Sequence, residues 1–197
     1  MKYEYDKTNQ NFYFTSHPYS DVATYFITFD PEIGEKKRIT ERQQLNNENA
    51  EESKFAKAFF LHKRELVDLF GSGRNWFGES FSISSNQNSF PLNLQGISVG
   101  YPANITLCLA NESSNPVSFS CKINGTEIGQ VNISSKHDDY AARLSTKQFS
   151  ANISSESPTL VLQFSGNSNV DKGRLDYLLI NYTKKLRFNN SALKFYS

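Results

Sequence analysis

The stretch that decides the fold holds three short runs: NITLCLA (Asn104–Ala110), VSFSCKIN (Val117–Asn124) and TEIGQVNI (Thr126–Ile133). The polar residues Asn111–Pro116 separate the first run from the second, and Asn124-Gly125 stands between the second and the third. Runs rich in apolar and β-branched residues that are bounded by turn-forming residues are typical of β-strands. The stretch therefore predicts three strands joined by turns.

Five further runs of the same kind flank this stretch: Ser80–Ser84, Gln95–Gly100, Ala142–Phe149, Thr159–Phe164 and Leu175–Asn181. Eight short strands with turns between them predict an all-β chain, in which antiparallel sheets pack as a β-sandwich of the jelly-roll type. We assign residues 71–197 to this sandwich. Residues 1–70 are predicted to form short strands and an exposed loop that pack on the sandwich or precede it.

Three shorter candidate strands lie near the N-terminus, at Asn11–Phe14, Ala23–Phe29 and Lys36–Thr40. The dipeptides His17-Pro18 and Asp30-Pro31 separate them, because proline interrupts the hydrogen bonding of a strand. The N-terminal part is therefore also predicted to be extended.

The charge balance of the 197-residue chain is nearly neutral, with 21 Lys and Arg against 20 Asp and Glu. This balance provides no long-range field that would attract nucleic acid or an anionic membrane. No stretch approaches the ~20 apolar residues of a membrane-spanning helix. The first residues, MKYEYD, lack the apolar region of a signal peptide. The chain is thus either cytosolic or a piece of a longer exported protein, and we favour the second interpretation.

Residues that carry chemistry are few and scattered. The three His residues have no ligand-like spacing, and neither Cys108 nor Cys121 has a second Cys two positions away. A zinc site is therefore not expected, and we predict no cofactor. Both Cys lie within apolar runs, which favours a structural role over a Cys–His nucleophile. A structural calcium ion bound by a loop such as Asp138-Asp139 stays open.

The two cysteines raise the question of a disulfide. In a hairpin that is symmetric about Ser114, Cys108 would face Cys121 directly. A register shifted by one residue instead aligns Leu109 with Phe119 and moves Cys108 to the other face. We favour the shifted register, and therefore predict two free thiols.

Seven Asn-x-Ser/Thr sequons allow two interpretations. They begin at Asn104, Asn111, Asn124, Asn132, Asn152, Asn181 and Asn189. They indicate either a glycosylated surface protein or chance in a chain rich in Asn, Ser and Thr. We favour chance.

Two segments stand out from this background. The first, GSGRNWFGESF (residues 71–81), holds the only Trp of the chain, bracketed by glycines that allow close backbone approach. Its plain structural interpretation is a core anchor, with Trp76 and Phe77 buried where the chain bends into the sandwich. The second, GRLDYLLI (residues 173–180), is a late strand that follows a polar turn.

Together these segments resemble the N-terminal β region of the type IX secretion sortases, which are gingipain-like cysteine peptidases of the PorU type. The family has an acidic residue at the position of Asn75 and an aromatic residue at the position of Arg174. The resemblance covers roughly Phe55 to the end, and it favours a strand at Ala56–His62, where local propensity favours a helix. The residues that carry it are assigned a structural role: Gly73, Arg74, Trp76, Phe77, Gly78, Glu79, Gly173, Leu175, Asp176 and Tyr177.

The resemblance also implies a cellular setting. The family is exported by Gram-negative bacteria and acts at the outer membrane, where it removes C-terminal signal domains from cargo proteins. Its Cys–His dyad belongs to a caspase-like domain downstream of this region, so no catalytic residue is carried over. The implied role is that of a scaffold or a docking surface for secretion-system subunits or cargo.

A carbohydrate-binding jelly roll is the alternative function. Its ligand would stack on exposed aromatic residues, and Tyr19, Tyr101 and Tyr140 lie in turn-like settings. Three Tyr residues on one concave face would favour sugar binding, and scattered positions would favour the scaffold.

Overall fold

The computed structural model describes residues 2–15, 54–69, 71 and 75–186. These residues form thirteen strands and no helix, which confirms the all-β prediction. No helix of this part of the chain is long and apolar enough to cross a membrane. The strands predicted at Ala23–Phe29 and Lys36–Thr40 lie outside the described residues.

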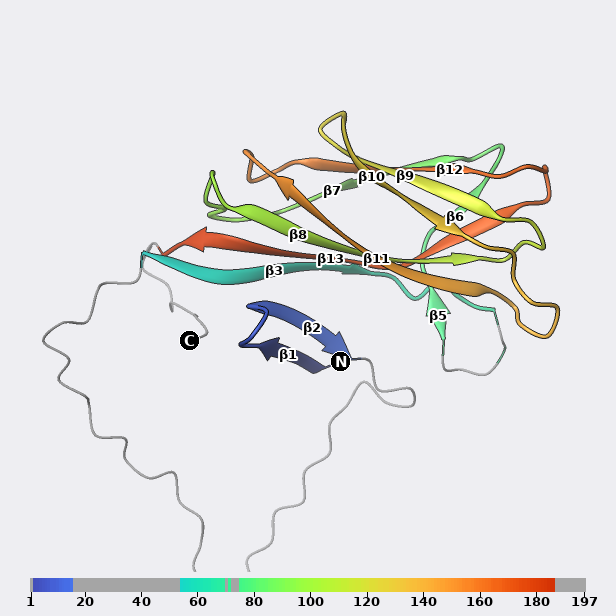
Figure 1. Cartoon of the computed structure of the whole chain (residues 1–197), viewed down its shortest axis with the longest axis horizontal. Coiled ribbons are helices and arrows are strands. Elements are labelled where there is room, and N and C mark those ends of the chain that lie inside the picture. Colours follow the sequence, from blue (N-terminus) through green and yellow to red (C-terminus); the bar gives the residue numbers. More distant parts are fainter. Residues whose placement is uncertain (1, 16–53, 70, 72–74, 187–197) are drawn as a thin grey trace, which may run out of the picture.

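Two antiparallel sheets form the sandwich (Figure 1). The four-stranded sheet has the order β10 (Thr126–Ile133), β9 (Val117–Ile123), β12 (Thr159–Ser165), β7 (Gln87–Pro91). The five-stranded sheet has the order β11 (Arg143–Asn152), β8 (Pro102–Asn111), β13 (Lys172–Lys185), β3 (Phe55–Lys63), and β6 (Ser80–Ser82) also pairs with β13. The predicted β-sandwich is therefore confirmed.

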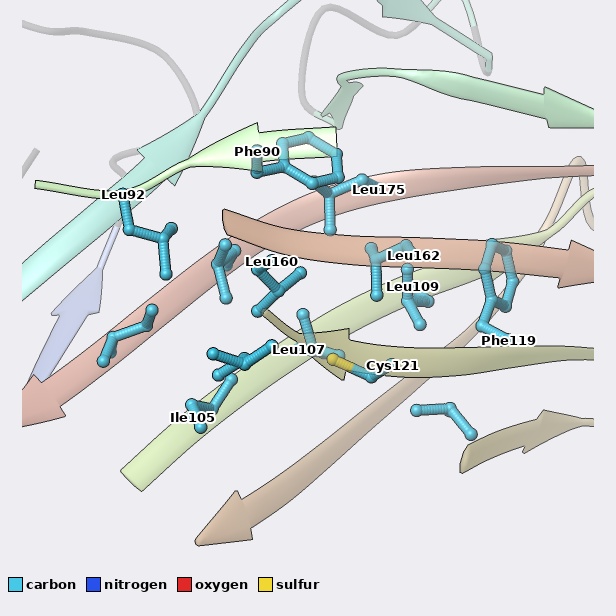
Figure 2. Packing of buried hydrophobic residues seen from close by; sticks show 14 of the residues in the cluster. Phe90, Leu92, Ile105, Leu107, Leu109, Phe119, Cys121, Leu160, Leu162 and Leu175 are labelled. Atoms are coloured by element: carbon cyan, nitrogen blue, oxygen red, sulfur yellow. The ribbon is translucent and has the colours of Figure 1, made fainter. Parts of the chain in front are cut away.

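The core lies between the facing sides of the two sheets (Figure 2). In β9, Val117, Phe119, Cys121 and Ile123 are buried, while the residues between them are only partly buried. This alternation follows from the two-residue repeat of a strand, which directs every second side chain into the sandwich. From the other sheet, Ile105, Leu107 and Leu109 of β8 pack against the same cluster.

Two short hairpins belong to neither sheet of the sandwich. One pairs β1 (Lys2–Asp6) with β2 (Asn11–Thr15), and the other pairs β4 (Val67–Asp68) with β5 (Trp76–Phe77). Phe12 of the first hairpin lies against Phe59 of β3, with the ring centroids 4.8 Å apart. Phe77 of the second packs with Ala110 and Ala142, on the side of β8 that faces away from the core. The two hairpins thus cover part of the outer face of the five-stranded sheet.

β3 settles the ambiguity between helix and strand at Ala56–His62 in favour of a strand. It pairs with β13 from Lys185↔Phe55 to Tyr177↔Lys63. The strand lies before residue 71, where we divided the chain, and it forms part of the five-stranded sheet. The division into two domains itself stays a prediction.

The hairpin expected between Asn104 and Asn124 is wrong. β8 and β9 lie in different sheets, so neither proposed register exists. Their apolar sides meet face to face across the core, because a connection through residues 112–116 crosses from one sheet to the other. Cys121 points into the core and Cys108 points to the opposite side of its sheet. Both thiols are free, as predicted, although the reason is the topology.

Two strand assignments also need correction. Residues 95–100 make no strand, only an isolated bridge between Ile97 and Lys184, because Gly96 and Gly100 adopt positive φ angles of 71° and 98°. β7 was missed, because only Phe90 of its five residues is buried and the strand pairs on one side with β12.

Candidate functional site

The structure brings together the two segments that carry the resemblance, although about a hundred residues separate them in sequence. The Gly78 N–H donates to the Leu175 carbonyl at 2.8 Å, and the Leu175 N–H donates to the Glu79 carbonyl at 3.0 Å. The pairing continues into β6, where Phe81 lies opposite Gly173. We call this contact, made by residues 76–81 and 173–177, the motif junction.

The motif junction holds two glycines, Gly78 and Gly173, at positions where neighbouring atoms leave no room for a side chain. A Cβ atom on Gly173 would lie 2.5 Å from Cζ of Phe119 and 3.1 Å from Cε2 of Phe164. A Cβ atom on Gly78 would lie 3.1 Å from the Leu175 carbonyl oxygen. A side chain at Gly173 would therefore press on the facing sheet, and one at Gly78 would press on the backbone of β13.

The carboxylate of Glu79 ties the junction to the end of β3. Its Oε1 lies 2.9 Å from Nε2 of His62 and 3.5 Å from Nη1 of Arg64. Its Oε2 is buried and has no hydrogen-bond partner. The three side chains line a cleft of about 340 Å³, which Phe90 and Asn88 of β7 close on the other side. The two contacts on Oε1 fix the position of the segment that holds Glu79.

Asp176 forms a second polar link across the outer face of the five-stranded sheet. It lies at a β-bulge, where the register between β13 and β8 shifts between Leu175 and Tyr177. The bulge lets its Oδ1 accept a hydrogen bond of 2.6 Å from Nζ of Lys63, a side chain that is almost fully buried. The same Nζ donates to the Trp76 carbonyl at 3.2 Å. The link therefore joins β3, β5 and β13 at one point.

Trp76 is not the buried anchor that we expected. Its side chain is 39% exposed, whereas Phe77 is 1% exposed. Successive strand residues point to opposite sides, so burying Phe77 against Ala110 and Ala142 turns Trp76 toward solvent. Of the other residues assigned to the motif, Leu175 is fully buried and Tyr177 is partly buried. Gly73 and Arg74 lie outside the described residues.

The two thiols are poor nucleophiles. Burial raises the pKa of Cys108 and of Cys121 to about 12 each, so both are protonated at neutral pH. Thr146 donates a long hydrogen bond of 3.4 Å to Sγ of Cys108. Within the described residues, no group of three or more His, Cys, Asp or Glu side chains is placed to hold a metal ion.

The proposed aromatic platform does not form from the Tyr residues. Tyr101 precedes β8 and Tyr140 precedes β11, and the pairs Arg143↔Asn111 and Asn152↔Pro102 place these strand starts at opposite ends of the sheet. Both side chains are exposed, but they lie at opposite ends of the sheet. Tyr19 lies outside the described residues.

Two rows of uncharged polar side chains lie on the outer face of the four-stranded sheet, beside a third row that holds Lys122 and Glu127. One row joins Gln130, Ser120, Gln163 and Gln87 across all four strands. The neighbouring row joins Asn132, Ser118 and Ser165. A hollow of about 350 Å³ lies at that end of the sheet, lined by residues 116–118, 132–134 and 165–167. Amide and hydroxyl groups of this kind suit a neutral, hydroxyl-rich ligand better than a charged one.

Sequence reasoning missed two buried asparagines. Asn111 donates to the carbonyl groups of Asn115 and Ser134, and Asn181 bonds to the backbone of Phe12. Both begin sequons, and both are too buried to carry a glycan. The only sequence signal for Asn181 was a polar residue at the end of an apolar run, Leu178–Ile180.

Comparison with known proteins defines the fold and leaves the function open. No protein-family model matches the chain, and no curated protein matches it. The crystal structure of dimeric latent PorU from Porphyromonas gingivalis superimposes with a TM-score of 0.59 and 21% sequence identity. The match covers 74% of this chain and 14% of that chain. This chain has the fold of a segment of PorU.

Two carbohydrate-binding modules match with lower TM-scores. The CBM36-1 domain of a multidomain xylanase from the hindgut metagenome of Trinervitermes trinervoides has a TM-score of 0.42 and 15% identity, over 64% of this chain and 94% of that chain. The carbohydrate-binding module CBM36 in complex with calcium and xylotriose has a TM-score of 0.38 and 11% identity, over 61% of this chain and 97% of that chain.

Proposed function

We propose that the chain is the non-catalytic N-terminal β module of a cell-surface, gingipain-like cysteine peptidase similar to the type IX secretion sortase. In this role it acts as a scaffold or docking surface for secretion-system subunits or cargo, and the Cys–His dyad lies downstream of residue 197. The module would work at the outer membrane of a Gram-negative bacterium.

The motif junction is the observation that carries this proposal. The resemblance rests on two segments far apart in sequence, and these segments are hydrogen-bonded to each other at Gly78, Glu79 and Leu175. Gly78 and Gly173 leave room for atoms that a side chain would clash with, and Asp176 forms an ion pair with Lys63. The motif residues therefore stabilise the same contact. The PorU-like fold supports the same proposal. The free, protonated thiols supply no nucleophile of their own.

The reading frame that encodes residues 1–197 provides the most direct test. If the proposal holds, this frame continues beyond the codon for Ser197 into a caspase-like domain with a Cys–His pair. A frame that encodes a glycoside hydrolase, or that ends without a peptidase domain, would contradict the proposal. Fractionation of the native host should then find the full protein with the outer membrane.

A carbohydrate-binding module is the second candidate, and two observations favour it. Trp76 is partly exposed, and an indole is the best stacking surface that the chain offers for a sugar ring. The outer face of the four-stranded sheet, with its hollow near Asn132 and Ser118, offers amide and hydroxyl groups. Neither surface is required by a scaffold role.

Affinity electrophoresis in gels that contain soluble polysaccharides separates the two candidates. Retardation of the wild-type chain by one polysaccharide, lost in Trp76→Ala or in Asn132→Ala, would favour the sugar-binding module and identify its binding face. Tyr140→Ala is the matched control, because it removes another exposed aromatic ring and Tyr140 does not line the hollow. Unchanged mobility in xylan, galactan and glucan gels would favour the scaffold.

A further inference from the structure

The four-stranded sheet ends in two edge strands, β10 and β7, and the edge at β10 is closed. A β-bulge interrupts β10 between Glu127 and Gly129, and the ring of Phe149 lies against Gly129. Nζ of Lys147 donates to the Gln130 carbonyl at 3.0 Å and so caps a backbone group at this edge. Bulges and lysine side chains are devices that keep an edge from pairing with another chain. The β10 edge is therefore protected against strand pairing.

The other edge, at β7, has backbone groups without partners. Two hydrogen bonds at the ends of β7 fix which of its residues bond to β12: Phe164 N–H to the Asn86 carbonyl, and Leu92 N–H to the Pro158 carbonyl. Bonded and non-bonded pairs alternate in an antiparallel ladder, so Gln87 and Ser89 direct their N–H and C=O groups away from β12. Within the described part of the chain, no strand pairs with this edge. The backbone of an extended chain would match these groups, which recur at every second residue.

A cleft of about 340 Å³ lies beside the open edge, between β7 and the end of β3. Ser89 and Phe90 line it on one side, and His62, Arg64 and Glu79 line it on the other. Oε2 of Glu79 is buried without a hydrogen-bond partner, which is a costly state for a carboxylate oxygen. The cleft therefore favours a group that can donate a hydrogen bond.

Strand geometry determines which side chains of an added segment would enter the cleft. Phe90 points into the core, and Asn88 bonds to the backbone of β6, so both face the five-stranded sheet. Residues opposite these two would point the same way, into the cleft, and the residue opposite Ser89 would point to solvent. Arg64 already lies 3.5 Å from Oε1 of Glu79, so a neutral amide or hydroxyl suits the site better than a second cation.

We propose that the open edge of β7 binds an extended segment of a partner protein, which adds a strand to the sheet and points an amide or hydroxyl side chain at Glu79. The inference rests on the proposed docking role and assigns a surface to it. The backbone of the segment would pair with Gln87 and Ser89, and its side chain would give Oε2 of Glu79 a donor. Because β7 has five residues and ends at Pro91, the added strand would be short.

Amide hydrogen exchange in the complete chain, followed by NMR, tests strand addition. The probe is a capped peptide that alternates Thr with Val and has Gln in place of the central Val. In the free protein, the amides of Gln87 and Ser89 should exchange fast. When the peptide fills about nine-tenths of the chains, exchange at both should slow by about tenfold, because only the free fraction exchanges. The amide of Gln130, on the closed edge, should not change.

Two variants and a second peptide separate backbone recognition from side-chain recognition. Ser89→Pro removes an outward N–H and should abolish binding, and the fold should tolerate proline there because this N–H takes no part in the sheet. Ser89→Ala keeps the N–H and should bind the peptide as the wild type does. A peptide with Leu in place of Gln should bind about tenfold more weakly, because Oε2 of Glu79 stays unpaired.

Unchanged exchange at Gln87 and Ser89 up to the solubility limit of the peptide would overturn strand addition, as would equal binding by Ser89→Pro. Equal affinity for the Gln and Leu peptides would overturn the role of Glu79. The reading frame gives an independent result. A peptidase domain beyond Ser197 together with an inert β7 edge would refute only this inference, whereas peptide binding without such a domain would refute only the proposed parent protein.

Discussion

Asp171 is a buried carboxyl group that accepts several hydrogen bonds. Burial alone would raise its pKa, but hydrogen bonds from Nδ2 of Asn115, from the N–H groups of Asn167 and Ser168 and from Ser113 hold the pKa of this carboxyl below its usual value. The side chain is fully buried and organises the loop that precedes β13. Its ionised form is therefore part of the folded structure.

The stability of the protein should accordingly depend on the ionisation of Asp171. Because the folded-state pKa is lowered, the contribution is present above the unfolded-state value of ~3.9 and is lost as the pH falls through the folded-state value. Asp171→Asn should cost about 1–3 kcal/mol at pH 7, and the difference from wild type should shrink toward pH 3. Urea unfolding across this pH range measures both. Asp138→Asn, in an exposed loop, should change neither, and an equal loss at pH 7 and pH 3 would contradict the assignment.

Neighbouring residues Trp76 and Phe77 should respond very differently to truncation. Phe77→Ala removes a buried ring from the cluster with Ala110 and Ala142 and should cost about 3–5 kcal/mol. Trp76→Ala should cost about 1–2 kcal/mol, because a large part of the indole already contacts solvent. Thermal melts of the two variants, with Tyr140→Ala as a neutral reference, measure the difference. Equal midpoints for Trp76→Ala and Phe77→Ala would contradict the observed exposures.

The two thiols should not react with thiol reagents in the folded protein. Because burial raises both pKa values to about 12, a thiol reagent at pH 8 should find almost no thiolate at Cys108 or Cys121. In denaturant without reductant, the same titration should find two thiols per chain. A result of zero in denaturant would mean that the cysteines form a disulfide in solution.

At the scale of elements, Gly173 sets the distance between β13 and the facing sheet. Gly173→Ala places a methyl group against the ring of Phe119 and should cost about 1–3 kcal/mol through overpacking. Phe119→Leu in the same chain makes room, so the double variant should lose less stability than the sum of the two single variants. Chemical denaturation of the four proteins in the cycle measures this coupling. If the losses of stability add up exactly, the cost of Gly173→Ala does not come from contact with the ring of Phe119.

Local patterns predicted the strands well where apolar residues recur and turns bound them. Thr126–Ile133 has the predicted limits, and Val117–Ile123 differs by one residue at its end. β7 was not predicted, because one buried Phe in a polar stretch gives no detectable alternation of apolar and polar residues. The pairing partner of each strand was harder to predict. Two strands with apolar faces can pair side by side in one sheet or face each other across the core. We predicted that β8 and β9 pair in a hairpin, whereas they lie in different sheets.

The motif junction was predicted only as two unusual segments and not as one contact. Glycines and a single Trp can be seen in the sequence, but their mutual approach depends on the path of the whole chain. The exposure of Trp76 could not be predicted from the sequence either, because a Trp next to a Phe at the start of a sandwich is usually buried. Asn181 recognises backbone atoms, which every residue has, so no partner could be inferred from sequence.

At the scale of the whole molecule, the chain should have no peptidase activity. Both thiols are buried, and burial raises the pKa of each to about 12, so both are protonated at neutral pH. Fluorogenic Arg and Lys peptides should stay intact when incubated with the purified chain. Cleavage that disappears in Cys108→Ala or Cys121→Ala would overturn this expectation, whereas cleavage that survives both variants would indicate a contaminating protease.

The longest strand has a mechanical consequence. β13 is paired with β8 over residues 173–181 along one edge, and with β6 and β3 over residues 172–174 and 177–185 along the other. A pull applied at the Lys185 end acts along the strand, so both edges are loaded in shear and many hydrogen bonds share the force. The bulge at Asp176, pinned by Lys63, adds an obstacle to sliding. A strand held in this way should resist a pull along its axis until many hydrogen bonds break together.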